Sequence, residues 1–267
     1  MRAPRPRAKA GSVRRPRKKV LLRQQGGSSL GMNTGQALKR CKSSPVEMDR
    51  QRVATCISLL EEQYGIPHPD ERDPVDLLVM TILSQNTSDT NSLRAFAHLK
   101  SAFCDYEEIL AASDEAVADA IRAGGLAEIK ARRIKEALFK IKQDGGAISL
   151  AFLADMGKDK AMAYLLSLPG VGPKTASVVL LFAFGMPFLP VDTHVYRISR
   201  RLGLLAQDVR PEKAQPLLER IVPVAKYLSL HLNLIKHGRL ICRARGPKHE
   251  DCALRNCCSY YLQGQKP

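Results

Sequence analysis

From residue 47 onward, apolar positions recur along the chain with the spacing of helices. The first predicted helix ends at Gly65, and its apolar face consists of Val53, Cys56, Ile57, Leu60 and Tyr64. Further helices are predicted over 74–84, 89–103, 113–121, 129–141, 150–156, 159–168, 173–185, 192–203, 211–221 and 224–236. Sustained period-two alternation and hairpin dipeptides between apolar runs do not occur. The pattern therefore predicts an all-α fold.

The first 45 residues lack this periodicity. They hold 13 of the 42 Lys and Arg residues and none of the 26 Asp and Glu residues, so the remainder has a net charge of only 29 − 26 = +3 out of the total of +16. Basic, Pro, Gly and Ser residues with little to bury predict a disordered tail over 1–45. A polyanion-binding arm or nuclear signal around RRPRKK, a transit peptide and a solubilising extension remain open interpretations.

The composition narrows the class of protein. Trp is absent and aromatic residues make up 5% of the 267 residues, so an aliphatic core of packed helices is expected. No apolar run approaches the roughly 18 residues of a membrane span, and the N-terminus lacks the apolar centre of a secretory signal. We expect an intracellular protein with no membrane partner, in a bacterial cytoplasm or nucleoid or in a eukaryotic nucleus or mitochondrion.

The segment SLPGVGPKTA (167–176) predicts a tight turn between two helices. Gly170, Val171 and Gly172 form the turn, and Pro173 suits the first turn of the second helix. Backbone N–H groups at a helix N-terminus form a ready phosphate site. A helix-hairpin-helix over about 161–185 that clamps a DNA backbone, and an ordinary helix–helix turn, are equally consistent with these four residues.

Two charged residues follow the hairpin. Lys174 lies in the first turn of its helix, where the positive helix end disfavours an ammonium group and favours a neutral amine nucleophile. A lysine that only pairs with phosphate remains an alternative. Asp192, in VDTHVYR, stands where a helix N-cap is expected, and a cap is the common role of Asp at that position.

Four of the seven cysteines lie within 242–258, CRARGPKHEDCALRNCC. Clustered cysteines in a reducing compartment indicate metal binding before a disulfide.

The motifs LPGVGPKTA, VDTHVYR, HGRLIC, GLAEIKARRI and the cysteine cluster resemble the endonuclease III family of DNA glycosylases, over about residues 46–260. The resemblance implies a two-lobed all-α fold. One lobe is a six-helix barrel (67–186) that contains the hairpin. The other lobe is a helical iron–sulfur domain formed by 46–66 and 187–267.

The resemblance also implies the chemistry. Lys174 would attack C1′ of a flipped-out nucleotide and cut the strand through a Schiff base and β-elimination, while Asp192 would stabilise the cationic sugar. The expected function is base-excision repair by a monomer that acts on oxidised pyrimidines or abasic sites in double-stranded DNA. Two alternatives remain: the same fold acting on adenine, 8-oxoguanine or 5-methylcytosine, and a non-catalytic helix-hairpin-helix protein.

Three further residues match family positions that enter the duplex. Gln85 and Asn86 stand where the family usually has Ala-Gln, and either amide could reach the orphaned base. Leu126 matches the apolar wedge that keeps the duplex open. A core leucine is the competing interpretation of Leu126.

The family binds a [4Fe–4S] cluster with the spacing C-x6-C-x2-C-x5-C, which here falls on Cys242, His249, Cys252 and Cys258. Histidine replaces thiolate in some iron–sulfur centres, so a cluster with His249 as fourth ligand is the first choice. A Cys3His zinc site is the second and a metal-free remnant the third, and Cys257 is a substitute ligand if the loop shifts. The intervening loop would present Arg243, Arg245 and Lys248 to phosphate.

Overall fold

The computed structural model describes residues 45–69 and 71–264, with side chains from Asp49 onward in the first helix. The predicted disordered tail lies outside the described residues except for Pro45. The described residues form helices, turns and loops but no β-strand, which confirms the all-α prediction. None of the helices in the described ranges combines the length and the apolar character that crossing a membrane requires.

The helices lie close to the predicted positions. Their bounds are α1 Pro45–Tyr64, α2 Pro74–Leu83, α3 Asp89–Ala102, α4 Tyr106–Ala111, α5 Asp114–Ile121, α6 Ala127–Gly145, α7 Lys158–Leu166, α8 Pro173–Phe184, α9 Thr193–Leu202, α10 Pro211–Ile221, α11 Tyr227–Leu240 and α12 Ser259–Leu262. The short helices α4 and α12 were not predicted. The predicted helix over 150–156 is instead a 3₁₀-helix, Ala151–Asp155. A separate 3₁₀ turn, Val224–Lys226, precedes α11.

Side-chain caps fix where several helices begin. Asp73 accepts hydrogen bonds from the backbone N–H groups of Val75 and Asp76 at the start of α2, where Pro74 occupies the first position. Ser113 caps α5 as predicted, by accepting from Ala116 N. These caps are local sequence features, which explains why the helix starts were predictable.

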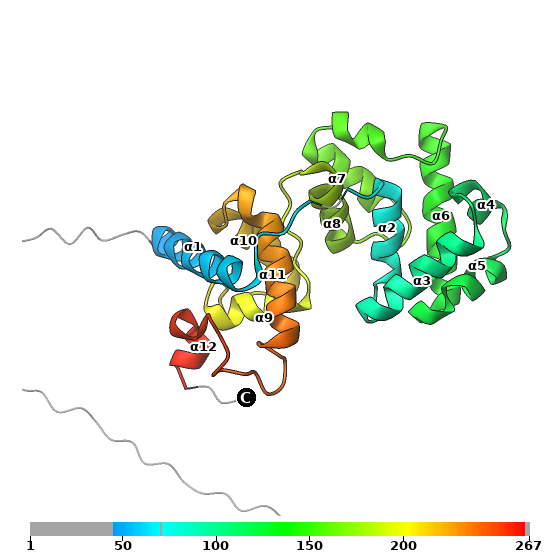
Figure 1. The fold of residues 1–267 in the computed structure, drawn as a ribbon. Helices are drawn as coiled ribbons and strands as arrows, with labels where there is room; N and C mark the ends of the chain where they lie inside the picture. The colour runs from blue at the N-terminus through cyan, green and yellow to red at the C-terminus, as the bar shows by residue number, and fades with distance from the viewer. Residues whose placement is uncertain (1–44, 70, 265–267) are drawn as a thin grey trace, which may run out of the picture. The chain divides into compact units, whose positions relative to one another are not determined.

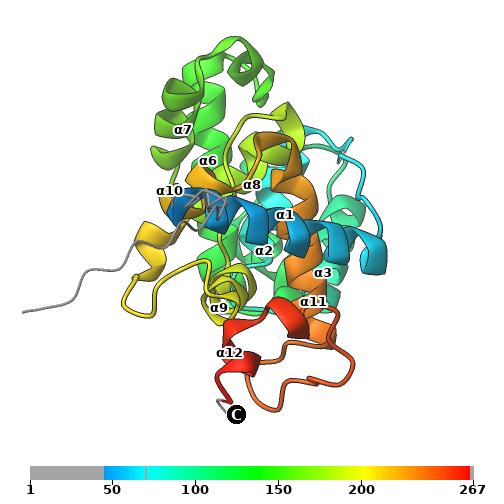
Figure 2. The ribbon, with the colours of Figure 1, turned by 90° about the vertical axis from the view of Figure 1, so that its left-hand side faces the viewer.

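Buried apolar residues form two clusters. One gathers side chains from α2 to α8, and the other joins α1 to α9, α10, α11 and the C-terminal loop. Figures 1 and 2 show α1 lying beside α11, although the two helices are far apart in sequence. We propose that the clusters are the cores of the two expected lobes, 67–186 and 46–66 with 187–267.

Helix α8 belongs to both clusters. Its Ala176, Val179 and Leu180 pack in the first cluster, whereas Leu181 packs in the second. The N-terminus of α8 is the second half of the glycine hairpin, so residues at this end lie where the two clusters meet.

Candidate active site

The hairpin forms as its glycines predicted. Gly170 has φ of +76°, a conformation that glycine adopts without strain. A Cβ at Gly170 would lie 2.7 Å from Cδ of Arg133 on α6, so glycine is also required by packing. Gly172 is the N-cap of α8, Pro173 follows it, and Val171 is buried beneath the turn. The turn therefore packs closely against Arg133 on α6.

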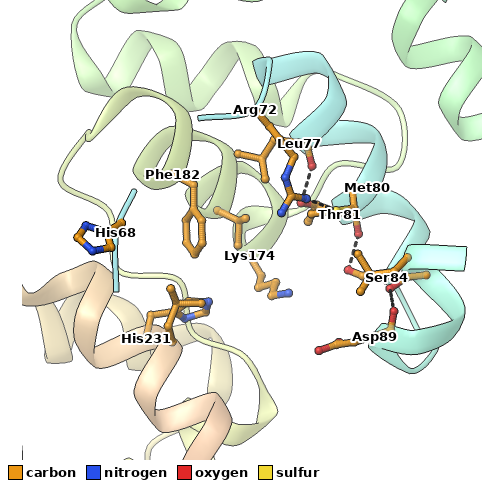
Figure 3. Close-up of a pocket in the computed structure, with 14 residues that line it drawn as sticks. His68, Arg72, Leu77, Met80, Thr81, Ser84, Asp89, Lys174, Phe182 and His231 are labelled. Carbon is orange, nitrogen blue, oxygen red and sulfur yellow. Dashed lines mark hydrogen bonds between the residues drawn. The ribbon is translucent and has the colours of Figure 1, made fainter. Parts of the chain in front are cut away.

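Lys174 is exposed and stands in the first turn of α8. Figure 3 shows its side chain extending into a space bordered by Thr81, Ser84, Phe182 and His231. This cavity has a volume of about 420 Å³. The amine therefore reaches a pocket instead of lying flat on the surface.

Asp192 is the N-cap of α9, as predicted, because its Oδ1 accepts from Val195 N at 2.8 Å. The cap does not exclude a second role. A larger cavity of about 850 Å³ is lined by Asp192 and Lys174 together. Gln85 and Asn86 from the α2–α3 loop and Arg239 from α11 also line it. The fold thus brings the carboxylate and the amine, separated by 18 positions in sequence, to one cavity.

His231 on α11 lies beneath this pair and was not singled out in the sequence. Its Nδ1–H donates to Pro190 O at 2.9 Å, and the residue is only 2% exposed. The pKa of His231 is lowered to about 4, chiefly by burial; the Asp192 carboxylate opposes this shift and the Lys174 ammonium group adds to it. The imidazole is therefore neutral near pH 7. Its sequence context, an apolar helix, carries no signal for such a position.

Gln85 and Asn86 differ sharply in their contacts. The Gln85 amide donates to Gly170 O at 3.1 Å, and its carbonyl oxygen accepts from Arg133 Nη1 at 3.2 Å, so it ties the α2–α3 loop to the hairpin. Asn86 is exposed and has φ of +54°. The Gln85 amide is therefore hydrogen-bonded within the protein, whereas Asn86 is exposed to solvent at the cavity.

Leu126 is 50% exposed, which excludes the interpretation as a core leucine. It precedes α6 and has left-handed backbone angles, φ of 52° and ψ of 39°. Leucine rarely adopts this conformation, so the turn holds the side chain outward at some cost in strain.

In the C-terminal loop, Cys242, His249, Cys252 and Cys258 line one small cavity, together with Arg201 and Tyr260. Cys242 and Cys258 are buried. Arg243, Arg245 and Lys248 are exposed on the loop between the first two of these residues, as predicted. The spacing of the motif therefore brings its four side chains to one place.

Within the described part of the chain, no three His, Cys, Asp or Glu side chains are close enough to hold a single metal ion. A mononuclear Cys3His zinc site, which needs all ligands at about 2.0–2.3 Å from one ion, gains no support. The His249 ring packs near the rings of Tyr260 and Tyr261, at centroid distances of 6.0 and 5.2 Å. His249 therefore lines the cysteine cavity, but its ring does not join a group of side chains close enough to bind one metal ion.

Cys257 does not stand in as a ligand in this arrangement. Its Sγ lies 3.6 Å from Sγ of Cys56 on α1 and donates to Leu254 O at 3.2 Å. It points toward the second apolar cluster and is not among the residues that line the cysteine cavity.

Two arginines of α9 hold the cysteine loop. Arg201 donates to the backbone carbonyls of Arg243 and Ala244, at 2.7 and 3.0 Å, and lies 3.2 Å from Cys242 Sγ. Arg197 donates to Cys242 O at 3.0 Å and to Gly238 O at 3.1 Å. These contacts were not predicted from the sequence. The arginines' spacing of four on one helix face was the available signal that they share a partner.

Comparisons with known proteins identify the family of this chain. Residues 79–224 match the family model described as HhH-GPD superfamily base excision DNA repair protein. The chain is 35% identical to an endonuclease III of Thermotoga maritima over 197 residues, which is 73% of this chain and 87% of the relative. It is 34% identical to an endonuclease III of Sulfolobus acidocaldarius over 218 residues, 78% of this chain and 95% of the relative.

Solved structures give the same result. The fold superimposes on a trapped endonuclease III–DNA covalent intermediate, an estranged-adenine complex, with a TM-score of 0.69 and 28% identity. It superimposes equally well on a non-covalent endonuclease III–DNA complex, with 29% identity. Both alignments cover 81% of this chain and 99% of the solved chain.

Proposed function

The chain belongs to the endonuclease III family within the HhH-GPD superfamily of base excision DNA repair proteins, and we propose that it is a DNA glycosylase with AP lyase activity. Its proposed substrates are oxidised pyrimidines and abasic sites in double-stranded DNA. The observation that carries the proposal is the shared cavity, where the exposed amine of Lys174 and the carboxylate of Asp192 face the same space. Because its substrate is DNA, the enzyme acts inside the cell.

We assign the two residues complementary steps. The lone pair of the Lys174 amine bonds to C1′ while the C1′–N glycosidic bond breaks, and the bonding pair leaves with the base, which takes up a proton. Opening of the sugar ring gives a Schiff base between Nζ and C1′. Loss of a C2′ proton then expels the 3′-phosphate by β-elimination. Asp192 stabilises the positive charge that develops on the sugar and relays the protons.

The remaining residues have proposed roles in binding DNA. The hairpin N–H groups around Gly170, Val171 and Gly172 bind a backbone phosphate at the N-terminus of α8. Asn86 fills the hole left by the flipped nucleotide, since its exposed amide faces the cavity, whereas Gln85 fixes the hairpin. Leu126 is the wedge, because it is exposed and held outward.

The endonuclease III family is generally associated with a [4Fe–4S] cluster. The donor set here fits in part, because three thiols line one cavity while no single-ion site is formed. We propose that Cys242, Cys252 and Cys258 hold such a cluster and that His249, which lines the same cavity, supplies the fourth ligand. When bound, the cluster supplies a rigid structural tie. Arg243, Arg245 and Lys248 would then meet the DNA backbone on a fixed loop.

Borohydride trapping tests the proposed activity. Borohydride reduces a Schiff base to a stable amine, so the wild-type protein should cross-link to duplex DNA that contains thymine glycol or an abasic site. Lys174→Ala should abolish the cross-link, because no other amine replaces Nζ at C1′. Lys160→Ala is the matched control, since Lys160 is an exposed lysine on the other helix of the hairpin.

A cross-link that survives in Lys174→Ala would contradict the assignment of the nucleophile. Absence of any cross-link in the wild type, with DNA binding intact, would indicate a non-catalytic DNA-binding protein. Excision from a panel of duplexes containing thymine glycol, 8-oxoguanine or mismatched adenine tests the proposed preference for oxidised pyrimidines.

A further inference from the structure

Lys130 on α6 is a buried cation that the proposed chemistry does not use. The residue is 1% exposed, although lysine is rarely buried without a partner. Its Nζ donates to Leu83 O at 2.7 Å and to Gly124 O at 2.8 Å. Both acceptors are backbone carbonyls, and burial lowers the pKa of the ammonium group. The side chain therefore joins two chain segments that are separated by 41 positions.

Each of these segments leads directly into an element proposed to enter the duplex. Leu83 is the last residue of α2, so the α2–α3 loop with Asn86 begins immediately after it. Gly124 ends a 3₁₀ turn, two residues before Leu126. The carbonyls at a helix C-terminus lack partners within the helix and carry partial negative charge, so an ammonium group is well placed beside them.

The backbone after each bonded carbonyl is strained. Of the residues that the structure describes, Asn86 and Leu126 are the two non-glycine residues with positive φ, 54° and 52°. Left-handed conformations of this kind persist where the surrounding structure over-determines them, and they concentrate at functional sites. Lys130 bonds the chain three residues before one of them and two residues before the other.

The two segments also pack directly against each other. A Cβ at Gly124 would lie 3.1 Å from Cβ of Ala95 and 4.0 Å from Leu83 O, so the turn leaves little room for a larger residue. Arg133, one turn further along α6, bonds Gln85 in the same loop. Lys130 and Arg133 of α6 therefore both hold the α2–α3 loop. Lys130 also holds the turn before Leu126.

We propose that Lys130 is a positioning residue that fixes the separation between Asn86 and Leu126, so that both enter the duplex together as the damaged nucleotide leaves the stack. The proposal rests on the proposed function and on the roles assigned to these two residues. Extruding a stacked, paired base costs unstacking and unpairing energy, which the two insertions together would offset. An abasic site has no base to unstack, so its cleavage by Lys174 depends less on this separation.

The test compares two reactions of the same protein under single-turnover conditions. Lys130→Met keeps the length and apolar stem of the side chain but removes the donor. We expect excision of paired thymine glycol to slow about 10- to 100-fold, since misplacements near 1 Å have effects of this size. Strand cleavage at a preformed abasic site should change less than about threefold. A 2-aminopurine opposite the lesion should report reduced base separation by its fluorescence.

Lys135→Met is the matched control on the same helix. Lys135 Nζ also bonds a backbone carbonyl, that of Ala112, and pairs with Asp114 at 2.9 Å, but it lies away from both inserting elements. It should lose stability without separating the two reactions. If Lys130→Met does not fold, Lys130→Gln, whose shorter amide retains a donor, should show the same selective loss to a smaller extent.

Three outcomes would overturn the proposal: equal losses in both reactions for the Lys130 variants, unchanged rates in both, or the same selective loss in Lys135→Met. Failure of the wild type in both reactions would instead refute the proposed function. The two failures are therefore distinguishable in one set of assays.

Discussion

The loops that we propose to contact DNA are held by different means in the two apolar clusters. In the α2–α8 cluster, loops are fixed by protein groups alone: Lys130 bonds two backbone carbonyls, and Arg133 bonds Gln85. In the other cluster, Arg201 donates to backbone carbonyls of the cysteine loop, and the thiols of Cys242, Cys252 and Cys258 line one cavity. The first cluster therefore fixes its loops through side-chain hydrogen bonds, whereas the second also gathers the side chains that we propose hold a [4Fe–4S] cluster.

The histidines also differ between the two clusters. The second cluster lies around α11, which buries His231 and His237. In the described barrel region, His98 on α3 and Cys104 after it are both exposed. Acid, and loss of the proposed cluster, should therefore act mainly on the second lobe, while the proposed chemistry uses Lys174 from one lobe and Asp192 from the other.

The largest effect should come from removing the carboxylate that the second lobe contributes to the proposed active site. Asp192→Asn keeps an N-cap for α9, because Asn caps as well as Asp, but it removes the negative charge. We expect excision of thymine glycol to fall at least about 100-fold, the typical effect of losing one electrostatic contact to a transition state. DNA affinity and thermal stability should stay near wild type. Full excision activity in Asp192→Asn would show that Asp192 only caps α9.

Acid should destabilise the second lobe first. Burial lowers the pKa of His231 to about 4, below the value of about 6.5 in an unfolded chain. Its contribution to the free energy of unfolding is therefore present above pH 6.5 and is lost as the pH falls toward 4, by up to about 3 kcal/mol. His231→Gln should flatten this decline in urea titrations at pH 7.5 and 4.5.

The exposed His98 provides the control for the pH experiment. His98→Gln should leave the decline between pH 7.5 and 4.5 unchanged. The decline in His231→Gln should not vanish, because burial also lowers the pKa of His237 to about 4. An identical pH dependence in the wild type and His231→Gln would show that His231 does not contribute to acid sensitivity.

The smallest effect should come from loosening the cysteine loop. Cys252→Ala should lose iron in protein purified without oxygen, and Cys104→Ala, at an exposed cysteine, should keep it. DNA affinity of Cys252→Ala should fall about tenfold, with a shallower salt dependence, because each lost phosphate contact reduces the slope by about 0.9. Iron retained fully in His249→Ala would contradict histidine ligation.

Local sequence predicted most of the helices, the hairpin turn and the positions of Lys174 and Asp192 at helix starts. Apolar spacing, Asp73 and Ser113 caps and the paired glycines act within a few positions, so their outcome was readable from the chain. The short helix α4 was not predicted, because six residues are too few to show a helical periodicity. The motif around Lys174 and Asp192 was likewise legible, since each residue lies at a helix start.

Only the tertiary structure decided which polar side chains form hydrogen bonds within the protein and which are exposed. Gln85 and Asn86 are chemically alike and adjacent, and both line the cavity, yet Gln85 bonds the hairpin at Gly170 whereas Asn86 is exposed. Lys130 looked like one more cation of a basic amphipathic helix, but it is buried against carbonyls 47 and 6 positions away. Such contacts depend on how distant helices pack, and periodicity along one helix carries no information about the acceptors that another helix will present.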